Sequence, residues 1–236
     1  ELGDVENIAG MLKGFETLGL ALGVVAASVF AVKEAFDLSL EGEKIERITD
    51  QFNLLSQSAG ISAEQLKTSL ESNSHGLIAQ TDLLAAASKG IVELGKNSMI
   101  MGQTMEIAMK ISKVSGQDAL EVFSGLNNAV AAGNVRMLRQ YGIIVDNQKA
   151  LVSYAQSHGK FVSDLTEEEK RQAVATQALM KARDAYKNIN VESVSLTEET
   201  KKLNVQWTEF KDSVALAVEK IFKPVFMPIV SAMTTA

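Results

Sequence analysis

The apolar residues of the first forty positions recur at alternating intervals of three and four, which is the spacing of a seam along an α-helix. The pattern predicts one long apolar helix over residues 1–41, rich in alanine and glycine. Residues 17–32 within it carry no charge. At 1.5 Å per residue they would span about 24 Å, which is less than the roughly 30 Å of a bilayer core. We therefore expect a buried or self-associating helix, with insertion into a membrane as the alternative.

Four glycines on this segment form two pairs, and the members of each pair are four positions apart. They are Gly10 with Gly14, and Gly19 with Gly23. This spacing removes side chains from one face of a helix, so that another backbone can approach closely. The four glycines are therefore the predicted close-packing or membrane-contact positions.

The middle of the chain, residues 42–160, is divided by glycines into short apolar segments. After Gly42 the regular spacing of apolar residues restarts out of register, which indicates a second helix. This helix is expected to end at Gly60. Further helix starts are predicted where a Ser or Thr stands three positions before a residue that can complete a capping box. These pairs are Ser62 with Gln65, Ser115 with Asp118, Thr166 with Glu169, and Ser195 with Glu198. Helices this short are marginal alone, so we predict a compact helical domain.

The last region, residues 161–236, returns to long helices. One is predicted from Asp164 to Lys187, with acidic residues at its start and basic residues near its end, as the helix dipole favours. In the next helix, apolar residues recur at intervals of four and three with one polar member, Thr200. The other positions of this heptad seam are Leu196, Leu203, Trp207, Phe210, Val214, Ala217 and Ile221. Such a seam predicts a partner helix.

Trp207 lies in the middle of the seam, which favours a role as an interhelical anchor over one in stacking on a ligand. Pro224 and Pro228 follow the seam. Because proline lacks an amide donor and disfavours helix in the residue before it, the two are expected to interrupt or kink this helix.

Composition narrows the fold class to all-α. The chain has only two prolines among 236 residues, where average usage would give roughly 12. Helix-forming residues are abundant, and the apolar run at 143–145 is too short for a sheet and is expected to be a buried connector. We predict a long N-terminal apolar helix, a compact multi-helix middle and long C-terminal seam helices that assemble as a helical oligomer.

Charge and cysteine content exclude several kinds of function. Lys and Arg total 23 against 29 Asp and Glu, a net charge of −6. The chain lacks the basic excess that neutralises phosphates, so tight nucleic-acid binding is not expected. Cysteine is absent, which removes disulfides, thiolate metal ligands and a cysteine nucleophile. The sequence begins at Glu1 rather than Met, which indicates a fragment or a processed product.

One stretch approaches a phosphate-binding loop. Residues 90–97 fit the pattern G-x-x-x-x-G-K-[ST] except at the last position, which is Asn97. The hydroxyl that would bind Mg²⁺ is missing, Glu93 would oppose a phosphate, and the preceding residues are typical of a helix. We expect a helix end followed by a turn.

Other candidate residues favour structural roles. His75 and His158 each precede a glycine and have no partner at metal-ligand spacing, so they are expected on the surface or capping helices. The acidic run 167–169 suits the first turn of a helix. Clustered methionines could form an adaptable binding face, but core packing is the favoured interpretation; they are Met99, Met101, Met105 and Met109. No catalytic residue, metal ligand or cofactor is predicted, and the protein is not expected to be an enzyme.

Three motifs, in this order, resemble the tail tape measure proteins of tailed bacteriophages. The first is GNVRMLRQYGIIVD at 133–146, the second is YAQSHGK at 154–160, and the third is LTEEEKRQA at 165–173. Family members carry a helix of small residues ending in glycine, a Leu-x-x-x-Gly-Ile-x-x-Asp connector and two helices with the other motifs. The similarity covers residues 110–190, and the apolar helix at 15–36 and the sequence at 59–64 are also similar.

The resemblance implies a virion structural protein in the lumen of the phage tail, which helps set tail length and is released during DNA ejection. It implies a homo-oligomer of three copies, with tail tube and tail tip proteins as partners and the host inner membrane as a further candidate. Before assembly, such a protein is in the host cytoplasm. Family members usually have many hundreds of residues, so this chain is expected to be a segment, near the tail tip. The alternative is a membrane-inserting helical protein that forms or delivers a channel for DNA.

Overall fold

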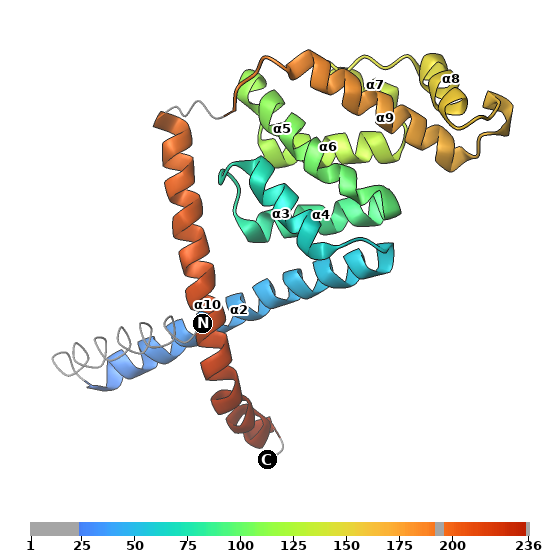
Figure 1. Ribbon diagram of the computed structural model, residues 1–236. Helices are drawn as coiled ribbons and strands as arrows, with labels where there is room; N and C mark the ends of the chain where they lie inside the picture. The colour runs from blue at the N-terminus through green and yellow to red at the C-terminus, as the bar shows by residue number, and fades with distance from the viewer. Residues whose placement is uncertain (1–23, 192–195, 235–236) are drawn as a thin grey trace. The chain divides into compact units, whose positions relative to one another are not determined.

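The computed structural model describes residues 24–191 and 196–234, and every regular element there is a helix (Figure 1). This confirms the all-α prediction for the described residues. The elements are α2 (Val24–Ala59), α3 (Ala63–Ser74), α4 (Gln80–Leu94), the 3₁₀ helix η1 (Gly95–Ile100), α5 (Met101–Ser115), α6 (Ala119–Ala131), α7 (Val135–Gln140), α8 (Asn147–Ser157), the 3₁₀ helix η2 (Val162–Asp164), α9 (Glu167–Tyr186) and α10 (Leu196–Thr234). The paired glycines at positions 10, 14, 19 and 23 lie outside the described residues.

The chain forms two compact units. One contains the described residues up to Thr49 and those from Gln206 onward, and the other is Asp50–Val205. Helices α3 to α9 belong wholly to the second unit. The predicted compact middle therefore corresponds to helices that pack on one another, and these extend beyond residue 160 to include α9.

Helix α5 is at the centre of the second unit, where it packs against α3, α6 and α9. Met101 and Met105 from α5 are fully buried, as are Phe123 and Leu126 from α6. Burying one such side chain stabilises the fold by about 1.5–3 kcal/mol. Met109 is also buried, whereas Met99 is exposed, so the core-packing interpretation is confirmed for three of the clustered methionines.

Local hydrogen bonds explain where several helices begin. Thr166 and Glu169 form the predicted capping box at the start of α9. At the start of α3, the hydroxyl of Ser62 accepts a hydrogen bond from the amide of Gln65 at 3.3 Å. Both N-caps are confirmed, because each satisfies a backbone donor that the first helical turn leaves unpaired.

The start of α6 differs from the prediction. Ser115 is the last residue of α5, and Asp118 is itself the N-cap, accepting from the amides of Leu120 and Glu121. Gly116, with φ of 74°, ends α5 between them. The predicted pairing of Ser115 with Asp118 is therefore wrong, because an aspartate caps a helix as well as a serine does. Ser195 lies outside the described residues.

Helix α2 runs through Gly42 without a break, so the prediction of separate helices before and after this residue is wrong. A Cβ atom on Gly42 would lie 2.5 Å from the carbonyl oxygen of Ala215 in α10. Both residues belong to the first unit. Glycine at this position therefore permits a close helix crossing instead of ending a helix, although it destabilises a helix by about 0.5–1 kcal/mol relative to alanine.

Within the described part of the chain, three other glycines lie inside α-helices, namely Gly90 in α4, Gly102 in α5 and Gly125 in α6. Each faces a neighbouring side chain at a distance too short for a Cβ atom; at Gly125 this neighbour is the hydroxyl of Tyr141. The prediction that these glycines divide the chain into segments is wrong at these positions, because close packing requires them.

Helix α10 continues to Thr234, past Pro224 and Pro228, so the predicted interruption is not present. Each proline removes only its own amide donor, and residues four apart lie on the same side of a helix. The hydrogen bonds on the other sides can therefore continue. Between α7 and α8, the predicted connector has Ile143 and Val145 buried.

Candidate functional site

The predicted seam of α10 is exposed over much of its length. The exposed fractions are 65% for Leu203, 60% for Trp207, 47% for Phe210 and 51% for Ile221. Val214 and Ala217 are partly buried. Leu196 is the first residue of α10, but its side chain is not among those described. We call these four exposed residues, with Val214 and Ala217 between them, the α10 stripe.

Trp207 and Phe210 are the aromatic residues of the α10 stripe. Their ring centroids are 5.5 Å apart and the ring planes differ by 23°, so the rings are stacked. One helical turn separates the two residues, which places both rings on the same face. Large apolar patches on a protein surface mark interaction sites, and the stripe is therefore the candidate functional site.

Another face of α10 is occupied by α2. Ala215 and Glu219 are nearly fully buried, and both lie within reach of a Cβ atom on Gly42. Successive residues of a helix differ by about 100° in direction, so Ala215 lies about 80° from Trp207 and about 140° from Phe210, and Glu219 lies about 120° and about 180° from them. Packing of α2 therefore leaves the α10 stripe uncovered.

A small ionic network accompanies this crossing. The Nζ atom of Lys223 donates to Glu219 Oε1 at 2.8 Å and lies 3.9 Å from Glu46 Oε2 of α2. The hydrogen bond to Glu219 is the main reason that the pKa of Lys223 is raised. The spacing of apolar residues in the sequence does not predict this crossing. Its available signal was the pair of small residues Gly42 and Ala215, which permit close approach of two backbones.

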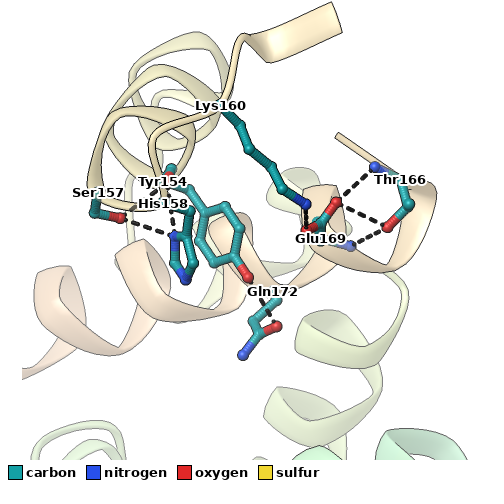
Figure 2. A network of polar contacts seen from close by, with 7 residues as sticks. All are labelled: Tyr154, Ser157, His158, Lys160, Thr166, Glu169 and Gln172. Atoms are coloured by element: carbon teal, nitrogen blue, oxygen red, sulfur yellow. Dashed lines mark hydrogen bonds and ion pairs between the residues drawn. The ribbon is translucent and has the colours of Figure 1, made fainter. Parts of the chain in front are cut away.

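A second cluster of polar contacts joins α8 to α9 (Figure 2). Lys160, just after α8, donates a hydrogen bond to Glu169 in the first turn of α9. The same carboxylate accepts from the backbone amide of Thr166 at 2.9 Å. These bonds, the one from Lys160 first, hold the pKa of Glu169 at about 2, and the pKa of Lys160 is raised in turn.

Tyr154 and His158 complete this cluster. Their rings stack with centroids 4.1 Å apart, and the Tyr154 hydroxyl donates to Gln172 Oε1 at 3.1 Å. His158 Nδ1 lies 2.8 Å from the carbonyl oxygen of Tyr154. His158 is the C-cap of α8, and His75 is the C-cap of α3 with φ of 53°. Both histidines therefore cap helices, as predicted.

The three motifs at 133–146, 154–160 and 165–173 have clear structural roles here. The first contains α7 and ends at Asp146, whose carboxylate caps α8 by accepting from Lys149 N at 3.1 Å. The second ends α8, and the third contains the capping box of α9. All the residues labelled in Figure 2 belong to the second and third motifs. These motif residues thus determine how α8 and α9 begin, end and join.

Residues 90–97, which approach the phosphate-loop pattern, are helical. Gly90 lies within α4 and packs against the sulfur of Met101, and α4 ends at Leu94 before η1. The predicted helix end is confirmed. In the ranges that the structure describes, no group of three or more His, Asp or Glu side chains is placed to hold a metal ion. Over the same ranges, no helix combines the length and the apolar character needed to cross a membrane.

No protein-family model matches this chain, and no solved structure matches it. The fold and the candidate site define an all-helical protein, within the described residues, that presents an apolar aromatic stripe on a long helix.

Proposed function

We propose that this chain is a structural segment of a bacteriophage tail tape measure protein. In this role it lies in the lumen of the tail, helps to set tail length and is released during DNA ejection. The observation that carries the proposal is the ordered set of three motifs at 133–146, 154–160 and 165–173. The all-helical structure of the described residues is compatible with it, and the roles of these motifs in joining α8 to α9 give a physical reason for the pattern.

Association between copies is the second part of the proposal. The α10 stripe supports it, because Leu203, Trp207 and Phe210 remain exposed after the chain has folded. Covering such side chains on assembly is favourable by about 25 cal/mol per Å² of apolar surface. Tail tube and tail tip proteins are the other proposed partners. The net charge of −6 suits a protein that must leave the tail with DNA, since like charges repel.

Localisation in the virus that encodes the chain tests the tail assignment. Peptides from residues 50–205 are expected in purified tails, protected from protease while the tails are intact and lost from them once DNA has been released. The major tail tube protein is the matched control, because it stays in the tail after ejection. Absence of these peptides from virions, cleavage of the chain in intact tails, or retention after ejection would contradict the proposal.

A further inference from the structure

An open pocket of about 580 Å³ lies among α7, the connector after it, the start of α8, and α9. Its lining residues lie between Val135 and Lys181, so the pocket belongs wholly to the second unit. The charged residues that line it are Arg139, Asp146, Lys149 and Lys181. Three of these four side chains are basic, whereas the whole chain has a net charge of −6. The pocket is therefore a positively charged site on an acidic protein.

Two of the three basic side chains have no ion-pair partner among the residues that the structure describes. They are Arg139 and Lys181, and both are exposed. The third, Lys149, has its Nζ atom 3.8 Å from Asp146 Oδ2. Since Asp146 also caps α8 through its Oδ1 atom, its negative charge is already engaged. The pocket therefore presents Arg139 and Lys181 to the carboxylates of a ligand.

The connector adds an apolar side chain and free backbone donors to the pocket. Ile143 and Val145 are buried, and Ile144 between them is 69% exposed, which is the alternation of an extended segment. The backbone amides of Ile144 and Val145 donate to no residue that the structure describes. An extended peptide that lies along such a segment accepts hydrogen bonds from it as an added strand does. One of its side chains can then cover Ile144.

We propose that this pocket binds an extended acidic segment of a partner protein. One carboxylate of the segment pairs with Arg139, a second pairs with Lys181, and an aliphatic side chain covers Ile144. Charge-assisted hydrogen bonds of this kind are the stronger ones in proteins, and arginine favours them because its guanidinium group can hold a carboxylate through two bonds. The inference goes beyond the tail assignment and uses neither that assignment nor the α10 stripe.

Nucleic acid fits the pocket less well than an acidic peptide does. Proteins that bind single strands combine a long basic groove with aromatic side chains on which bases stack. None of the described residues that line this pocket is aromatic, and the carboxylate of Asp146 would oppose a phosphate. A peptide instead supplies an apolar side chain for Ile144 and backbone carbonyls for the connector amides.

Fluorescence anisotropy with the full chain tests the class of ligand. The probes are labelled peptides with blocked ends that carry two glutamates and one leucine at every spacing from adjacent to three apart. At least one peptide is expected to bind saturably, and replacing both glutamates by glutamine should weaken it by about threefold to thirtyfold, because both ion pairs are lost. A single-stranded oligonucleotide of the same length is the comparison. No saturable binding by any peptide, equal binding of the glutamine peptides, or tighter binding of the oligonucleotide would overturn the proposal.

Charge reversal tests the location of the site. Arg139→Glu with Lys181→Glu is expected to weaken binding of the acidic peptide by at least about tenfold, because two attractive pairs become repulsive. Lys89→Glu with Lys96→Glu makes the same change in net charge at exposed positions that do not line the pocket. In about 0.15 M salt, which screens distant charges, this control should bind within about twofold of the wild type. Equal losses in the two double variants would overturn the site.

Nuclear magnetic resonance of the wild-type chain tests the same site without any substitution. The acidic peptide is expected to shift the backbone amide signals of Ile144 and Val145, because their donors become hydrogen-bonded. Signals at both positions that stay unchanged when the peptide is bound would overturn the proposed site.

Discussion

Helices α5 and α10 both carry large apolar residues at helical spacing. Those compared here are buried in α5 and exposed in α10. In α5, Met101 and Met105 are fully buried because α3, α6 and α9 pack around that helix. In α10, Trp207 and Phe210 are exposed although α2 packs on another face of the same helix. A helical period determines which residues share a face. Whether that face is covered within the chain depends on neighbours that the period does not specify.

The largest expected effect contrasts two phenylalanines. Phe123→Ala is expected to lower the free energy of unfolding by about 3–5 kcal/mol, because it leaves a cavity in the core. Phe210→Ala is expected to change it by less than about 1 kcal/mol in the monomer, because that side chain is already exposed. Urea denaturation at concentrations low enough to prevent association measures both. Equal losses of unfolding free energy in the two variants would contradict the difference in burial between Phe123 and Phe210.

A buried amide gives the next largest effect. Asn127 in α6 is buried, and neither its Nδ2 nor its Oδ1 atom has a hydrogen-bond partner in the described structure. Asn127→Leu keeps the number of heavy atoms and removes two unpaired polar groups, so we expect a gain of about 1–2 kcal/mol in unfolding free energy. Thermal and urea unfolding measure it. Asn128→Leu, at the exposed neighbouring position, is the control and is expected to stay within about 0.5 kcal/mol. A loss of stability in Asn127→Leu would show that this amide has a partner.

Removal of the α9 cap should have a smaller effect. Thr166→Ala deletes the hydroxyl that accepts from the amide of Glu169 at 3.2 Å, and we expect a loss of about 1 kcal/mol in unfolding free energy. Thr176→Ala, on an exposed turn within α9, is the matched control and should not destabilise the chain, because alanine favours helix. Equal losses in both variants would contradict a specific role for the cap.

The smallest expected effect is a dependence on pH. Folding lowers the pKa of Glu169 from 4.5 to about 2, so its ionised form stabilises the folded state above pH 4.5. This stabilisation is lost as the pH falls from 4.5 through about 2. Glu169→Gln should therefore reduce the fall in melting temperature over this interval.

Lys160→Met provides a check on the cause of that pH dependence. It removes the hydrogen bond that contributes most to the lowered pKa of Glu169, so it should also flatten the curve between pH 4.5 and 2. An unchanged acid profile in both variants would contradict the role assigned to this ion pair.

Features set by a few adjacent residues could be predicted from the sequence. The capping box of Thr166 and Glu169 is an example, because both partners lie in the first turn of one helix. Gly42 is the contrasting case. The residues around Gly42 do not show whether a helix ends there or whether another helix crosses closely at that point. The answer depends on Ala215, which lies far along the chain.

The candidate site could be predicted only in part. The spacing of Leu203, Trp207 and Phe210 correctly placed them on one helix. Their exposure could not be inferred in the same way, because the methionines that share a face of α5, at intervals of four residues, are buried. The outcome depends on which helix faces find partners inside the chain, and those partners come from distant parts of the sequence.

Sedimentation equilibrium of the full chain over a wide concentration range tests the claim that the α10 stripe is a contact between copies. The wild-type chain is expected to associate as concentration rises, and the double variant Trp207→Asp with Phe210→Asp is expected to remain monomeric. Phe161→Asp, at a side chain that is 78% exposed outside α10, should associate like the wild type. A monomeric wild-type chain at every concentration, or a double variant that associates equally well, would contradict the claim.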